Sequence, residues 1–202
     1  CIAIRSLKLI PCRVACAKLI IWHILTTFNS YFYRYLLTMN MVIVLKKMNS
    51  KPSLLIITRS DETTTWSKLH RGLETHDLAH YAVESTLQFN NAFYGLINKG
   101  FTVADFELPK EQRPKEVQPQ HLHENAIITE HLVNLLEVEL MNSGLNTNFL
   151  IDLSEILKKN ALSFPKLLNT ETLKQIRTTY HNLVNQWSNL EEGQELRIDF
   201  MP

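Results

Sequence analysis

The acidic residues of this chain are confined to its second part. All 20 Asp and Glu lie after residue 47, together with 14 of the 21 Lys and Arg, so residues 48–202 carry a formal charge of −6 (14 − 20). Residues 1–47 hold the other seven basic residues (21 − 14) and no acid. A composition boundary this sharp separates segments of different kinds. We therefore predict a single domain over residues 48–202, and an upstream extension or mis-assigned start over residues 1–47 that is not part of the fold.

Two other interpretations of the extension stay open. Residues 19–45 are apolar on average and long enough to span a bilayer. His23, Asn29, Arg34 and Asn40 interrupt that span, and an arginine near a bilayer centre costs about 2.5–3.5 kcal/mol. The extension is also basic and acid-poor, as a targeting peptide is, but it has no clean apolar core followed by a small-residue cleavage site. Membrane association through residues 19–45 is therefore the alternative location.

The cysteines and the charge of residues 48–202 narrow the class of protein. All three cysteines lie in the extension, at positions 1, 12 and 16. A domain without cysteine suits a reducing compartment, so we expect a soluble cytoplasmic protein. Its net charge is negative and it has no basic stripe, which disfavours nucleic acid as a partner. A small-molecule substrate is the partner that remains, and the oligomeric state is left open.

Hydrophobic periodicity predicts an α+β domain. Residues 53–59 and 63–69 are β-prone and form a hairpin, and residues 196–200 alternate strictly as a third strand. Helical patterns cover four further stretches, residues 76–99, 122–141, 148–159 and 170–190. The expected architecture is a small three-stranded antiparallel sheet, in which the last strand pairs with the hairpin, packed on one face against about four helices.

The segment richest in chemistry starts the first predicted helix and reads His-Asp-Leu-Ala-His-Tyr-Ala-Val-Glu from position 76. His76 and His80 are four residues apart, so their side chains share one helix face and can bind one metal ion. Glu84, one turn further, can orient His80 by accepting its free ring N–H. Asp77 could be a ligand together with His80, or a base acting on a metal-bound water. Asp77 and Glu84 are the candidate catalytic residues.

Further ligands for such an ion are predicted on the second helix. His121 lies in a cluster of polar residues at the start of that helix. Glu130 is a polar residue among apolar neighbours and is predicted to face inward. The candidate metal ligands are therefore His76, His80, His121 and Glu130. Zinc fits imidazole with carboxylate best, and iron or manganese would also be compatible.

Two functional hypotheses follow from this segment. In the first, the chain is a metal-binding protein with hydrolase-like or lyase-like chemistry. In the second, it is a non-catalytic interaction or structural domain, whose polar helix segment is a buried hydrogen-bond network that fixes the hairpin to the helix. Either could be tethered to a membrane if residues 1–47 are part of the protein. Nucleophile elbows, P-loops and dinucleotide fingerprints are all missing from the sequence, which has only five glycines.

Three short runs carry a resemblance to known proteins: residues 63–69 (TTTWSKL), 76–84 (HDLAHYAVE) and 93–96 (FYGL). Together they resemble a family of short bacterial proteins of unknown function over roughly residues 53–105. That resemblance implies a unit of hairpin plus helix and no established activity. The His-Asp-x-x-His core also resembles the zinc-motif helix of the Coq4 family of ubiquinone-biosynthesis proteins, which implies a helix able to hold a metal. Where that family has a glutamate after the second histidine, this chain has Ala92.

Overall fold

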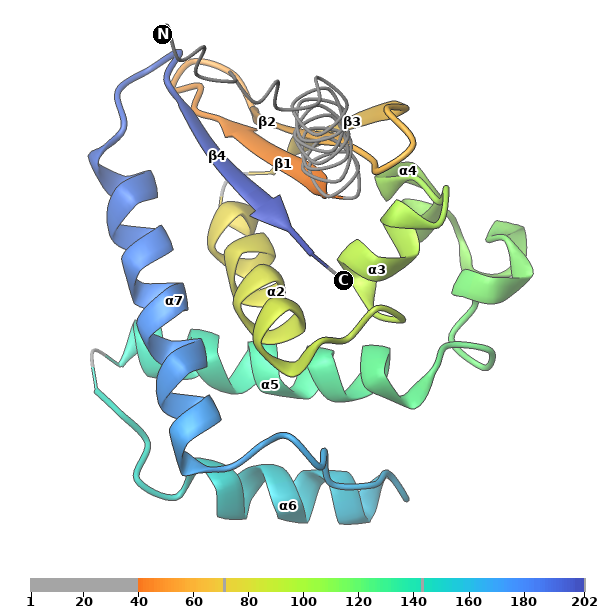
Figure 1. The fold of residues 1–202 in the computed structure, drawn as a ribbon, viewed down its shortest axis with the longest axis vertical. Helices are drawn as coiled ribbons and strands as arrows, with labels where there is room; N and C mark the ends of the chain where they lie inside the picture. The colour runs from red at the N-terminus through yellow and green to blue at the C-terminus, as the bar shows by residue number, and fades with distance from the viewer. Residues whose placement is uncertain (1–39, 71, 143, 202) are drawn as a thin grey trace, which may run out of the picture. The chain divides into compact units, whose positions relative to one another are not determined.

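The fold is built on a sheet of four strands. The computed structural model of the chain describes residues 40–70, 72–142 and 144–201. Strands β1 (Met41–Lys46), β2 (Ser53–Thr58), β3 (Thr64–Leu69) and β4 (Glu195–Phe200) form one antiparallel sheet in the order β3-β2-β1-β4 (Figure 1). The predicted α+β class is confirmed, and the sheet has one strand more than expected.

The additional strand comes from the segment that the charge boundary excluded. β1 lies between β2 and β4 and pairs with both, so β4 does not pair with the hairpin as predicted. Met41, Ile43 and Leu45 are fully buried, while Val42 and Val44 point to the other face of the sheet. Residues on both faces of β1 are apolar, so no polar–apolar alternation marks this strand in the sequence. The predicted start of the domain at residue 48 is therefore too late by one strand.

The membrane prediction falls largely outside the described residues. Of the proposed span over residues 19–45, only its last part is described, and Met41–Leu45 belongs to the sheet. Positions 19–39 lie outside the described residues, as does the rest of the predicted extension before them. In the part of the chain that the structure describes, no helix is both long enough and apolar enough to cross a bilayer.

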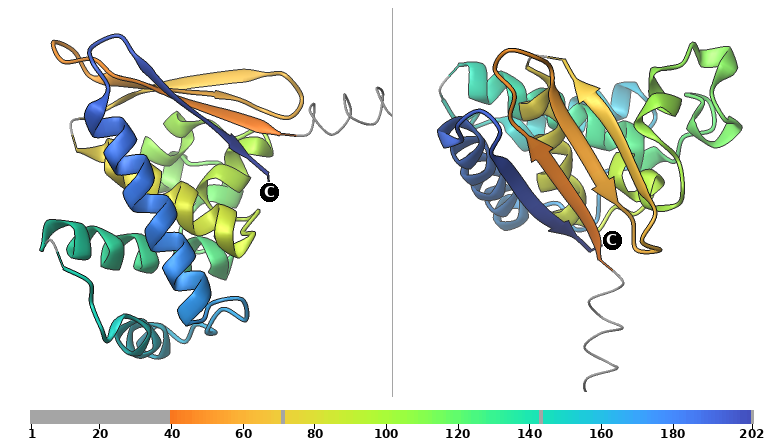
Figure 2. Two further views of the ribbon diagram at one scale, coloured as in Figure 1. Left: turned by 60° about the vertical axis from the view of Figure 1, so that its left-hand side comes forward. Right: turned by 90° about the horizontal axis from the view of Figure 1, so that it is seen from above.

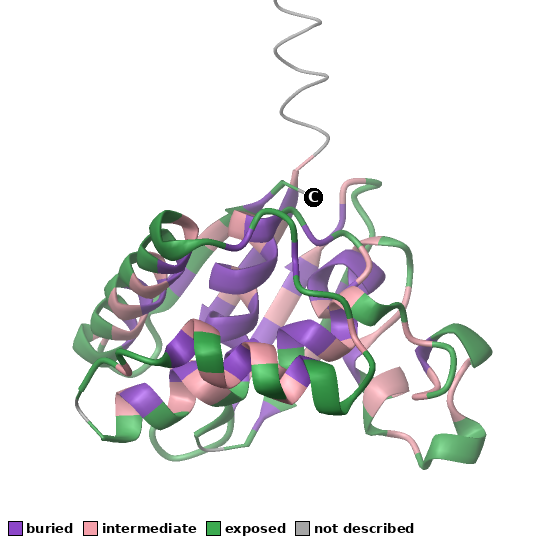
Figure 3. Cartoon of the chain, turned by 90° about the horizontal axis from the view of Figure 1, so that it is seen from below, coloured by how far each residue is buried: buried purple, intermediate pink, exposed green. Residues whose placement is uncertain are grey.

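The helices lie on one face of the sheet (Figure 2). Between β3 and β4 the chain forms α2 (Leu73–Leu87), α3 (Phe93–Asn98), α4 (Val103–Glu107), α5 (Glu124–Met141), α6 (Phe149–Lys159) and α7 (Thr170–Asn189), with 3-10 turns at Lys110–Gln112 and Lys115–Val117. α2 packs against both α5 and α7. More than half of its residues are buried, and Figure 3 shows burial concentrated in the middle of the molecule. The predicted helices that became α5, α6 and α7 are confirmed to within two residues at each end.

The first predicted helix is divided into two. α2 begins at Leu73, after Gly72 with φ 95°, and ends at Leu87, and the next residue, Gln88, also adopts a positive φ of 55°. The chain then turns back, and α3 starts at Phe93. Because of this reversal, α3 does not continue the axis of α2. Its first backbone N–H groups, those of Tyr94 and Gly95, instead point at Glu84 on α2. The prediction of one helix over residues 76–99 was wrong for this reason, and the break has a direct role in the site.

Candidate metal centre

α2 and α5 bring three metal-ligating groups together. His76 and His80 lie one turn apart on α2, and their Nε2 atoms are 3.2 Å from each other. Glu130 projects from α5, with its Oε1 atom 3.4 Å from Nε2 of His80. One ligand atom from each residue lies within 4.8 Å of the other two. The two rings therefore project into a shared space with a carboxylate, as the helical spacing of the histidines predicted.

The other nitrogen of each imidazole contacts a different carboxylate. Nδ1 of His80 lies 3.2 Å from Oε1 of Glu84, one turn further along α2. Nδ1 of His76 lies 3.3 Å from Oε2 of Glu137 on α5. When Nδ1 of an imidazole donates its proton to a carboxylate, the lone pair is left on Nε2. Both rings are thus held so that their Nε2 atoms point toward the same place.

Glu84 is held in position by the start of α3. Its side chain is fully buried, and Oε2 accepts the backbone N–H groups of Tyr94 at 3.0 Å and Gly95 at 3.3 Å. The close approach of this turn requires glycine, since a Cβ atom on Gly95 would lie 2.3 Å from the backbone carbonyl carbon of Asn90. Both oxygens of Glu84 are therefore engaged, which fits its predicted role of orienting His80 and not that of a free base.

The protonation of His80 is governed by its two carboxylate partners. Burial by itself would lower the pKa of His80, but the hydrogen bonds with Glu130 and Glu84, and their negative charges, outweigh it and raise that pKa to about 10. Burial by itself would raise the pKa of Glu130. The hydrogen bond with His80 and the charge of His80 outweigh burial and hold the pKa of Glu130 below its usual value. The space between these two side chains therefore favours a positive charge.

Asp77 is buried beside the same group without a partner. Among the described residues nothing hydrogen-bonds to its Oδ2 atom, although the side chain is almost inaccessible to solvent. Burial raises the pKa of Asp77 to about 7; the charge of His80 opposes that shift, and the carboxylates of Glu74, Glu130 and Glu137 add to it. A buried oxygen without a partner costs about 1–3 kcal/mol, so such atoms are uncommon in folded proteins.

Three of the four predicted metal ligands lie together in the structure. The structure brings together His76, His80 and Glu130, whereas His121 is exposed in the turn before α5 and does not belong to the group. Glu130 was predicted to face inward, but its side chain is about half exposed, at 53%. Sequence reasoning missed Glu137, although its separation of seven residues from Glu130 places both on one face of α5.

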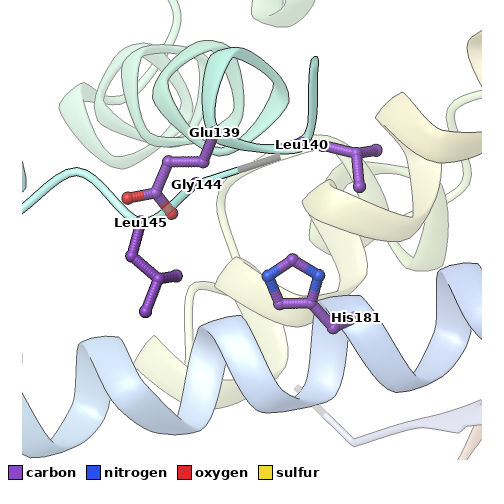
Figure 4. Close-up of a pocket in the computed structure, with 5 residues that line it drawn as sticks. All are labelled: Glu139, Leu140, Gly144, Leu145 and His181. Atoms are coloured by element: carbon purple, nitrogen blue, oxygen red, sulfur yellow. The ribbon is translucent and has the colours of Figure 1, made fainter. Parts of the chain in front are cut away.

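A separate hollow lies at the C-terminal end of α5. It has a volume of about 370 Å³ and is lined by Glu139, Leu140, Gly144, Leu145 and His181 (Figure 4). The carboxylate of Glu139 is already satisfied there, by Nε of Arg177 at 3.0 Å and by the backbone N–H of Asn146 at 2.7 Å. This hollow contains none of the three candidate ligands. The metal-ligating group instead meets solvent through the exposed side of Glu130.

Comparison with known proteins identifies no relative. No protein family, curated protein or solved structure matches the chain.

Proposed function

We propose that this chain binds one divalent metal ion through Nε2 of His76, Nε2 of His80 and the carboxylate of Glu130, and that the bound ion is used catalytically. The observation that carries the proposal is the spacing of the donor atoms. Two ligand atoms bound tetrahedrally to zinc at about 2.0–2.1 Å are separated by about 3.3 Å. The two separations from Nε2 of His80 are 3.2 and 3.4 Å. Zinc fits this set best, and iron and manganese accept the same donors.

The carboxylates behind the histidines support the same proposal. Metal-bound histidines commonly donate their second ring N–H to a carboxylate, which fixes the tautomer and makes the ring a better ligand. Here both histidines have such a partner, Glu84 for His80 and Glu137 for His76. A divalent cation would take the place of the proton that His80 shares with Glu130, so its charge would be matched by the surroundings.

The number of ligands favours catalysis over a purely structural ion. Structural zinc is closed by four protein ligands, whereas catalytic zinc keeps three and leaves a position for water. Among the residues that the structure describes, three metal-ligating side chains converge here, and Glu130 keeps the site in contact with solvent. A water held by the ion becomes a strong nucleophile near neutral pH. The proposed activity is therefore hydrolase-like or lyase-like.

A non-catalytic domain is the second candidate, and one observation favours it. The contacts from Glu84 through His80 and His76 to Glu137 form a continuous polar chain between α2 and α5, which could serve to fix these helices without any ion. The two candidates differ in one measurable property. Only the first requires a stoichiometric metal.

Metal titration of the full chain tests the proposal. After removal of bound metal with a chelator, calorimetry with Zn²⁺ is expected to show one ion per chain. Glu130→Gln and His76→Ala are each expected to weaken binding by more than about 100-fold, because each removes a ligand. His121→Ala is the matched control and should leave the affinity unchanged. Absence of stoichiometric zinc, or equal loss in the His121 variant, would favour the second candidate.

A further inference from the structure

The surroundings of the proposed ion are acidic. Glu130, Glu84 and Glu137 contact the two imidazoles directly. Asp77 lies beside them, within the electrostatic influence of Glu130, Glu137 and Glu74. With a divalent ion and neutral imidazoles, the three contacting carboxylates alone leave about one net negative charge (2 − 3), before Asp77 is counted.

Among the described residues, no Lys or Arg side chain forms an ion pair with these acids. The main charges acting on Asp77, His80, Glu84 and Glu130 belong to carboxylates and imidazoles. The Lys and Arg ion pairs found among residues 40–70, 72–142 and 144–201 are elsewhere, between Lys46 and Glu195 and between Arg177 and Glu139. Enzymes that act on phosphate groups place Arg, Lys or helix N-termini where the negative charge must be stabilised. This centre offers carboxylates instead, so an anionic substrate would be repelled.

One side of the centre is apolar. The ring of Phe93 lies against His80, with centroids 5.4 Å apart, and Phe106 lies against Phe93 at 5.2 Å. Both phenylalanines are only partly buried. An apolar group next to the reacting bond could pack on this pair.

We propose that the substrate is an uncharged ester or amide that carries an apolar group, and not a phosphate ester. The inference rests on the proposed metal centre, since it describes what that centre would accept. In the ester case, the oxygen of the metal-held water adds to the carbonyl carbon and the bond to the alcohol oxygen breaks. One proton of that water passes to the departing alcohol, and the products are the carboxylic acid and the alcohol.

Two compounds with the same leaving group test this assignment. The zinc-loaded full chain is supplied with 4-nitrophenyl butyrate and with 4-nitrophenyl phosphate, and release of 4-nitrophenol is followed. We expect kcat/KM for the butyrate to exceed that for the phosphate by at least about 100-fold, and zinc-dependent turnover to disappear in His76→Ala. Phe93→Ala should raise KM for 4-nitrophenyl butyrate, because it removes part of the apolar surface. It should leave KM for 4-nitrophenyl acetate, whose acyl chain is shorter, nearly unchanged.

A binding measurement accompanies the activity assay. Calorimetry on the zinc-loaded chain is expected to show binding of benzohydroxamic acid, which is uncharged in solution near neutral pH, binds metal ions through its two oxygens and carries an apolar ring. No binding of inorganic phosphate is expected at millimolar concentration. Three outcomes would each overturn the substrate assignment: preferential turnover of 4-nitrophenyl phosphate, tight binding of inorganic phosphate, or a zinc-loaded chain that hydrolyses neither 4-nitrophenyl butyrate nor 4-nitrophenyl phosphate. In all three cases zinc itself has bound, so the metal proposal stands; a chain that takes up no zinc refutes the metal proposal instead.

Discussion

A chain that begins at Met48 is expected not to fold. It lacks β1, which pairs with both β2 and β4 in the middle of the sheet, so β4 loses the strand it pairs with. Met41, Ile43 and Leu45 are fully buried. Burial of one such side chain contributes about 1.5–3 kcal/mol, so the three together contribute about 5–9 kcal/mol. A domain of this size usually has a free energy of unfolding of only about 5–15 kcal/mol, so the loss is comparable to the entire stability of the domain.

Circular dichroism and urea unfolding measure this effect. The matched control is a chain that begins at Met39, which keeps all of β1 and is expected to unfold cooperatively. The chain from Met48 is expected to show no cooperative transition. A cooperative transition with a similar midpoint in both chains would show that β1 is dispensable, and the four-stranded sheet would then be the wrong description of the fold.

Replacement of His80 by alanine is expected to have the second largest effect. The ring is buried and contacts Glu84, His76 and Glu130, so the variant loses a metal ligand and also leaves Glu84 buried without its imidazole partner. Removing one partner of a buried charged pair typically costs about 3–5 kcal/mol. We therefore expect His80→Ala to bind no zinc and to unfold at much lower urea concentration than the original chain.

A double-mutant cycle separates the two parts of that effect. Glu84→Gln keeps an oxygen for the N–H groups of Tyr94 and Gly95 but removes the charge that needs His80. In metal-free protein, His80→Ala together with Glu84→Gln should lose less stability than the sum of the two single changes, by about 0.5–3 kcal/mol. His121 is exposed, so the free energy of unfolding of His121→Ala should stay within about 0.5 kcal/mol of that of the original chain. Strict additivity would mean that the contact between Glu84 and His80 does not contribute to stability.

Local sequence patterns were sufficient to predict the part of the site that lies on α2. His76, His80 and Glu84 lie on one helix, so their relation follows from its period alone and needs no tertiary information. In the structure, Nδ1 of His80 lies 3.2 Å from Oε1 of Glu84. α6 and α7 were also predictable, since each has a clear apolar face.

The features that were missed depend on contacts between distant segments. β1 was hidden because both its faces are apolar and because a change in charge was taken for the domain boundary. The division into α2 and α3 depends on Glu84 accepting the N–H groups of Tyr94 and Gly95, which no local pattern encodes. Glu137 acquires its role only when α5 packs across α2. His121 was chosen because it lies in the polar cluster at the start of the second predicted helix, and the turn before α5 leaves it exposed.

The position of a bound ion tests the central claim most directly. Crystals of the full chain grown with Zn²⁺ and measured at the zinc absorption edge would locate the metal by its anomalous scattering. We expect one strong peak between His76, His80 and Glu130, at about 2.0–2.2 Å from Nε2 of each histidine and from a carboxylate oxygen. An empty space between those three side chains, or a sole peak at exposed residues such as His121 and His123, would contradict the proposed metal centre.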